Sequence, residues 1–136
     1  MIKILVFQRF LKTQKERFVI TGSDVEGSIP TQVASLNHLR ELDLSNNILR
    51  GKIPSLIKLR KLQRVLLGNN RLKGSIPSFS NNITIIDLGH NFLNGTISHS
   101  NVGNLTKLKE VMLKDNQLSG VIPSSIEALS NLETCE

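Results

Sequence analysis

The 136-residue sequence predicts an α/β repeat solenoid with short parallel strands stacked into one sheet. The first observation is a Gly-x-Ile-Pro unit at Gly27, Gly51, Gly74 and Gly120, with a Gly-Thr-Ile-Ser variant at Gly95. The second is an asparagine column, four residues before four of these glycines, at Asn47, Asn70, Asn91 and Asn116. The third is an apolar column three residues before each asparagine, at Leu44, Leu67, Leu88 and Leu113. Columns that keep their register over five units define a structural repeat.

Each column has a physical role in the predicted coil. Alternating apolar residues in Leu42-Asp43-Leu44 predict a short strand that sends its leucines inward and Asp43 outward. An inward asparagine can bond to backbone groups of neighbouring coils that would otherwise be buried without partners. Glycine then permits a tight bend, and proline fixes the stretch that follows. The prolines are Pro30, Pro54, Pro77 and Pro123.

The segments after the prolines differ in length. Residues 31–36 and 124–129 predict one helical turn each, of the 3₁₀ type, facing the core. The stretches 53–59 and 77–83 are shorter and are expected to be trimmed loops that leave the strand register unchanged.

The complete pattern, L-x-x-L-x-L-x-x-N-x-L-x-G-x-I-P, occurs at residues 39–54 and resembles the leucine-rich repeat of the plant-specific subtype. The resemblance covers residues 18–135 and implies a right-handed coil with one short-stranded parallel sheet on its concave face. We therefore expect a basic, apolar leader at 1–17 and a repeat array at 18–136, with about five coils and an incomplete last one.

The sequence looks most like the N-terminal ectodomain repeats of plant leucine-rich-repeat receptor-like kinases. That resemblance implies a non-catalytic module at the plasma membrane or outside the cell, acting in peptide perception, signalling or defence. Its partners would be a secreted peptide or another protein ectodomain, together with a co-receptor. Two alternatives stay open: a free-standing scaffold or inhibitor of the same fold, and a truncated receptor gene product, functional or not.

No catalytic or metal-binding pattern occurs in the sequence. His38, His90 and His99 occupy different repeat positions, and no phosphate-binding loop or kinase signature is present, so we expect no enzyme activity, cofactor or metal. One cysteine excludes an internal disulfide framework. Cys135 falls on an inward column and is expected to be a small buried hydrophobe, with the remnant of a capping disulfide as the alternative.

Residues 1–17 do not fit the repeat. The apolar stretch 4–7 is too short for the core of a signal peptide, and no apolar run approaches the roughly 20 residues that cross a bilayer. A mitochondrial transit peptide is an alternative because residues 1–15 contain no acidic residue, although they also contain no serine. We expect an amphipathic segment that lies over the exposed edge of the first coil.

Outward strand positions form the candidate binding surface, because the strand side of a solenoid is an extended docking face. Apolar Leu66, Ile85 and Met112 among charges are typical of a peptide-binding groove, although outward positions also tolerate almost any residue. His90 is either a pH-sensitive contact or a solvated neighbour of the asparagine column. The candidate ligand-binding residues are Arg40, Asp43, Arg64, Leu66, Ile85, Asp87, His90, Lys109, Met112 and Lys114.

The net charge of +6 is unevenly distributed. Residues 50–73 contain eight Lys and Arg and no acid, but only Arg64 among them is expected to face the groove. Nucleic acid is therefore a disfavoured partner. Three glycosylation sequons, at Asn82, Asn94 and Asn104, fall outside the outward strand positions and would leave the concave face open.

Overall fold

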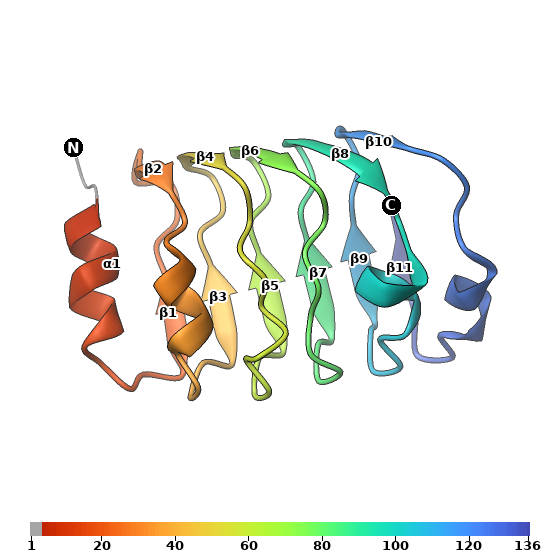
Figure 1. Ribbon diagram of the computed structural model, residues 1–136, viewed down its shortest axis with the longest axis horizontal. Helices are drawn as coiled ribbons and strands as arrows, with labels where there is room; N and C mark the ends of the chain where they lie inside the picture. The colour runs from red at the N-terminus through yellow and green to blue at the C-terminus, as the bar shows by residue number, and fades with distance from the viewer. Residues whose placement is uncertain (1–3) are drawn as a thin grey trace.

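Two parallel sheets run along the molecule in the computed structural model, which describes residues 4–136 (Figure 1). The larger sheet has six strands in the order β1-β3-β5-β7-β9-β11. Its strands are β1 (Arg17–Val19), β3 (Glu41–Asp43), β5 (Arg64–Leu66), β7 (Ile85–Asp87), β9 (Glu110–Met112) and β11 (Thr134–Cys135). Every pairing is parallel, which confirms the predicted α/β repeat solenoid.

The second sheet is a feature that the sequence pattern did not predict. Its strands are β2 (Glu26–Ser28), β4 (Ile48–Gly51), β6 (Arg71–Gly74), β8 (Phe92–Thr96) and β10 (Gln117–Ser119). The six-stranded sheet is the parallel sheet that the repeat predicts, and the five-stranded sheet is additional to it. Stacking places equivalent extended segments of successive coils side by side, so their backbone groups pair as strands before the chain turns.

The turn itself depends on glycine. Gly51 has a φ of +78° and Gly74 a φ of +85°, in the region that residues with a Cβ adopt only at a cost. The equivalent glycines in the other coils, Gly27, Gly95 and Gly120, also have positive φ.

The connecting segments follow the length of each unit. The predicted 3₁₀ turns occur as η1 (Thr31–Ser35) and η3 (Ser124–Ala128). The longest unit accommodates its extra residues in a π-helical turn, η2 (His99–Gly103). An isolated parallel bridge between Leu56 and Phe79 joins the connecting segments of the two short units. The pairing of β5 with β3 and with β7 keeps its register there.

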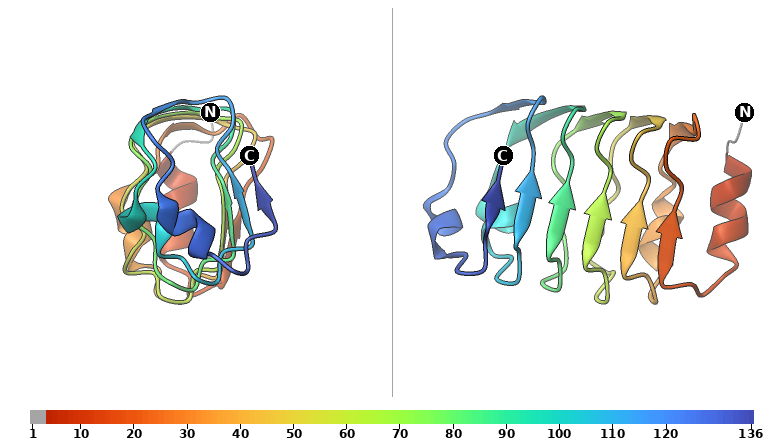
Figure 2. Two further views of the ribbon diagram at one scale, coloured as in Figure 1. Left: turned by 90° about the vertical axis from the view of Figure 1, so that its right-hand side faces the viewer. Right: turned by 180° about the vertical axis from the view of Figure 1, so that it is seen from behind.

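The core fills the interior of the coil, enclosed by the two sheets and by the connecting segments, and consists of inward columns. Leu44, Leu67 and Leu88 are fully buried, as the repeat spacing predicts. At the N-terminal end of the array, helix α1 (Ile4–Leu11) stands beside β1 and closes the first coil (Figure 2, right). Phe7 meets the ring of Phe18 edge-on at 5.4 Å between centroids. The position of α1 matches the expected amphipathic segment over the edge of the first coil.

The other end of the array corrects one expectation. Cys135 pairs in register with Val111, but its side chain is exposed rather than buried. Within residues 4–136, β11 has β9 on one side and no further strand on the other, so nothing covers this inward column. No helix among the described residues has the length and apolar character needed to cross a membrane.

Candidate binding site on the six-stranded sheet

The outward side chains of the six-stranded sheet form one continuous surface, here called the strand face. Each of the strands β1, β3, β5, β7 and β9 buries its middle residue and presents its first and third, because side chains alternate along a strand. The parallel register aligns these positions in two rows. The first row is Arg17, Glu41, Arg64, Ile85 and Glu110. The second row is Val19, Asp43, Leu66, Asp87 and Met112.

Three apolar side chains lie among charged ones at the centre of the strand face. Leu66 on β5, Ile85 on β7 and Met112 on β9 come from three successive strands, and each is half-buried. Leu66 and Met112 both register with Asp87, while Ile85 lies in the other row. With strands about 4.8 Å apart, the three side chains span roughly 10 Å across the sheet. We call these three residues the apolar patch.

One predicted site residue, Arg64, belongs to a shared ion pair beside the apolar patch. The Nε of Arg17 lies 2.8 Å from Oε2 of Glu41, and the Nε of Arg64 lies 3.8 Å from Oε1 of the same carboxylate. The Glu41 side chain is only 14% exposed. Its hydrogen bond raises the pKa of the Arg17 guanidinium above the ordinary value. Two arginines on β1 and β5 are thus held by one carboxylate on β3.

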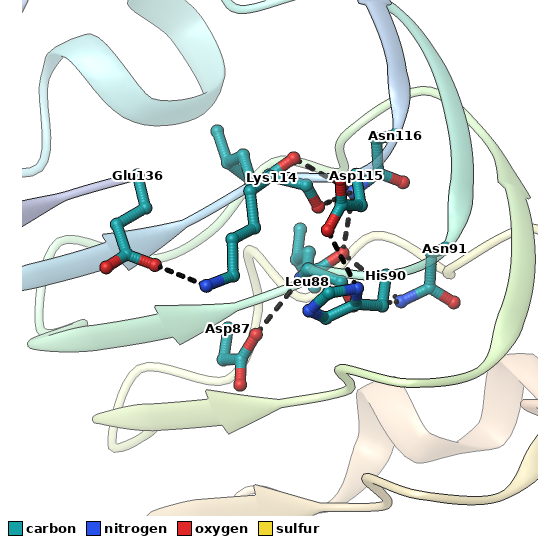
Figure 3. A network of polar contacts seen from close by, with 10 residues as sticks. Asp87, Leu88, His90, Asn91, Lys114, Asp115, Asn116 and Glu136 are labelled. Carbon is teal, nitrogen blue, oxygen red and sulfur yellow. Dashed lines mark hydrogen bonds and ion pairs between the residues drawn. The ribbon is translucent and has the colours of Figure 1, made fainter.

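Polar side chains beyond the ends of the strands are also paired across coils (Figure 3). The Nδ1 of His90 lies 2.9 Å from Oδ2 of Asp115, and the Nζ of Lys114 lies 2.9 Å from Oε2 of Glu136. The hydrogen bond with Glu136 raises the pKa of Lys114. His90 is exposed and has a φ of +53° in the turn before Asn91.

Two predicted aspartates hold the chain as it leaves the strands. The Asp43 carboxylate accepts the Ser45 N–H at 3.0 Å and its hydroxyl at 2.7 Å. The Asp87 carboxylate accepts the Gly89 N–H at 3.0 Å. It also lies over Gly68, where a Cβ would come within 2.8 Å of the carboxylate oxygen. Both carboxylates therefore have a local structural role in addition to facing outward.

The predicted site residues divide into three groups. Asp43, Arg64, Leu66, Ile85, Asp87 and Met112 lie together on the strands. His90 and Lys114 follow β7 and β9, at one edge of the strand face. Arg40 and Lys109 precede β3 and β9 at the opposite edge, three strands apart and thus roughly 14 Å from one another. The Nε of Arg40 lies 3.3 Å from a carboxylate oxygen of Glu16.

Sequence reasoning missed the acidic partners of these cations: Glu16, Glu41, Asp115 and Glu136. A usable signal was present for two of them. Arg17, Glu41 and Arg64 share one row with alternating sign, and His90 and Asp115 each precede a column asparagine. Opposite charges at equivalent positions of adjacent coils therefore predict ion pairs along a solenoid.

The sequon asparagines lie away from the strand face. Asn94 is exposed on β8, and Asn104 is exposed after η2. The side chain of Asn82 is already engaged, since its Nδ2 donates to the Arg60 carbonyl and its Oδ1 accepts from the Lys107 ammonium, both at 2.6 Å. Among residues 4–136, no three His, Cys, Asp or Glu side chains gather in a way that could hold a metal ion.

Comparisons with known proteins agree with this fold. The Leucine Rich Repeat family model matches residues 38–59 and 107–129. A curated Arabidopsis thaliana protein, named as a leucine-rich repeat receptor-like serine/threonine-protein kinase, is 49% identical over 90 residues. That match covers 62% of this chain and 9% of the curated protein.

Two solved ectodomains from Arabidopsis have the same fold. The receptor kinase GASSHO1/SCHENGEN3, in complex with CASPARIAN STRIP INTEGRITY FACTOR 2, gives a TM-score of 0.86 at 31% identity over 93% of this chain and 16% of its own. The receptor kinase HAESA, in complex with the peptide hormone IDA and the co-receptor SERK1, gives 0.80 at 32% identity over 88% of this chain and 21% of its own. This chain spans less than a quarter of each relative. The chain is a leucine-rich-repeat array of the plant type, and it resembles the ectodomains of plant leucine-rich-repeat receptor-like kinases.

Proposed function

We propose that this chain is a non-catalytic, ligand-binding segment of a plant cell-surface receptor ectodomain, and that its strand face binds a secreted peptide. The observation that carries the proposal is the apolar patch of Leu66, Ile85 and Met112 on three successive strands. Half-buried apolar side chains can gain further burial against a ligand, whereas the neighbouring cations already have acidic partners. The patch therefore supplies the binding energy, and the ion pairs around it define the orientation of the ligand.

The mode of binding follows from the position of the strands. β5, β7 and β9 are interior strands with neighbours on both sides, so a peptide cannot add to them as a further strand. It would instead cross them and contact side chains alone. Function would then consist of binding without chemistry, in which the docked peptide completes a surface for a co-receptor.

The relatives support this class of partner. The two solved ectodomains were determined with CASPARIAN STRIP INTEGRITY FACTOR 2 and with a peptide hormone plus a co-receptor. The exposed sequons at Asn94 and Asn104 are compatible with a position outside the cell, because glycans there would not cover the strand face.

A selection experiment tests the proposal. The purified chain is immobilised, and peptides that bind it are selected from a random library of displayed peptides. The selected peptides should lose about tenfold or more in affinity for the Ile85→Lys variant, because a charge replaces the centre of the apolar patch. The matched control is Phe92→Lys, which changes an exposed apolar residue on the second sheet. Equal loss in both variants, or no loss in either, would contradict the proposal.

A further inference from the structure

A group of cations lies on the second sheet, away from the strand face. Arg50 on β4, Lys52 directly after it, and Arg71 and Lys73 on β6 are all exposed. Arg50 and Arg71 are register partners on adjacent strands. We call these four residues the cation ridge. They are four of the eight Lys and Arg residues in the basic block at 50–73. The proposed binding of a peptide on the strand face does not explain these four charges.

The positive charges of the cation ridge are not neutralised by acidic side chains of the described residues. Across residues 4–136, none of its four side chains takes part in an ion pair, whereas Arg17, Arg40, Arg64, His90 and Lys114 around the strand face each pair with a carboxylate. Glu26 on the neighbouring strand β2 registers with Ile48 rather than with Arg50. Like charges in directly opposite positions destabilise a sheet, so the fold retains these arginines at a cost to stability.

The local packing accommodates this arrangement. The stem of Lys52 lies over Gly74 on β6, where a Cβ would come within 2.9 Å of the Lys52 Cγ. Lys52 is thereby brought close to β6, the strand that also carries Arg71 and Lys73. Phe92 follows on β8, where it registers with Lys73 and is 52% exposed. An exposed ring beside a row of cations completes the surface.

We infer that the cation ridge binds an acidic polysaccharide, a polymer of uronic acid units. Arginine guanidinium groups fit carboxylates through two parallel hydrogen bonds. The cations lie on, or directly after, two adjacent strands about 4.8 Å apart, so they can contact charges on neighbouring units of a linear polymer. The Phe92 ring can pack against the apolar face of a sugar. Nucleic acid fits less well, because single-stranded binding relies on several stacking aromatics and the chain contains no Trp or Tyr.

The two binding surfaces are separate. In Figure 1 the strands of the second sheet follow one edge of the molecule, apart from the strands of the six-stranded sheet. A polysaccharide on the cation ridge would leave the apolar patch open. This inference therefore does not depend on the peptide proposal, and the two can fail independently.

The test uses the full chain and polygalacturonate as the probe, at about 0.15 M salt to screen weak contacts. The variant Arg50→Gln/Lys52→Gln/Arg71→Gln/Lys73→Gln should bind about tenfold more weakly than the unaltered chain. The matched control, Lys12→Gln/Lys58→Gln/Arg60→Gln/Lys61→Gln, removes the same number of exposed charges elsewhere and should stay within about twofold. Circular dichroism melts verify that both variants are folded.

Two results would overturn the inference. If the control variant loses as much affinity as the ridge variant, binding depends on the net charge of the chain and not on the cation ridge. If single-stranded DNA binds more tightly than polygalacturonate and also depends on the ridge, the surface is a nucleic-acid site. Weaker binding of Phe92→Ala, with neutral dextran unbound throughout, would further support a saccharide contact.

Discussion

The side-chain Oδ1 of Asn70 accepts the backbone N–H of Leu49 at 3.0 Å, across the boundary between two coils. The Nδ2 of the same residue donates to the Leu44 carbonyl at 2.9 Å, and Asn70 is only 6% exposed. The equivalent bonds are made by Asn47, Asn91 and Asn116. We call these asparagine hydrogen bonds the asparagine ladder. The ladder satisfies backbone groups in the interior that the tight turns leave without partners.

Replacement of Asn70 by alanine should therefore lower the free energy of unfolding by about 2 kcal/mol, because the Leu49 N–H loses its acceptor in a buried environment. Urea denaturation measures the change. Asn81→Ala, at an exposed position, is the matched control and should have little effect. Equal destabilisation by the two variants would show that the ladder does not join the coils.

The Phe7→Ala variant tests whether α1 closes the first coil. Phe7 is 2% exposed and packs on Phe18, so its truncation should lower the free energy of unfolding by about 3 kcal/mol. Gln8→Ala on the exposed side of the same helix should change it only slightly. If both variants have the same denaturation midpoint, α1 does not pack on the array in solution.

The Lys114–Glu136 pair makes a prediction about pH. The hydrogen bond from Lys114 to Glu136 raises the pKa of the ammonium above its ordinary 10.5. A raised pKa means that the pair contributes fully below about pH 10, and that its contribution is lost as the pH rises through the folded-state pKa. An NMR titration of Lys114 should show a lower pKa in Glu136→Gln and no change in Glu133→Gln. An unchanged Lys114 titration in both would mean that the pair does not form.

The contact between Ser125 and Gly103 predicts a stabilising substitution. Within the described residues, the buried Ser125 hydroxyl has no hydrogen-bond partner, and a Cβ on Gly103 would collide with it. Ser125→Ala should raise the free energy of unfolding by about 1 kcal/mol, since it removes an unsatisfied polar group. Gly103→Ala should destabilise the chain, and less so in the Ser125→Ala background. Additive effects of the two substitutions in urea denaturation would refute the contact.

The repeat spacing predicted the inward columns and both outward rows, because strand alternation and solenoid register are set by local sequence. Leu44 and Leu67 are buried and Asp43 registers with Leu66, as the columns require. The second sheet could not be predicted from a single unit, since its strands exist only through pairing with neighbouring coils. The acidic partner of Arg64 comes from β3, the adjacent strand, so it can be predicted only by comparing equivalent positions of neighbouring coils. Cys135 was misassigned because burial of a column requires a further coil on top of it.

The apolar patch is the surface on which the proposed ligand binding depends. The most direct measurement is methyl NMR of the full chain during titration with the tightest-binding peptide from the library selection. The methyl signals of Leu66, Ile85 and Met112 should shift, while that of Ile48, half-buried on the second sheet, should not. Shifts at Ile48 with none at Leu66, Ile85 or Met112 would contradict the account.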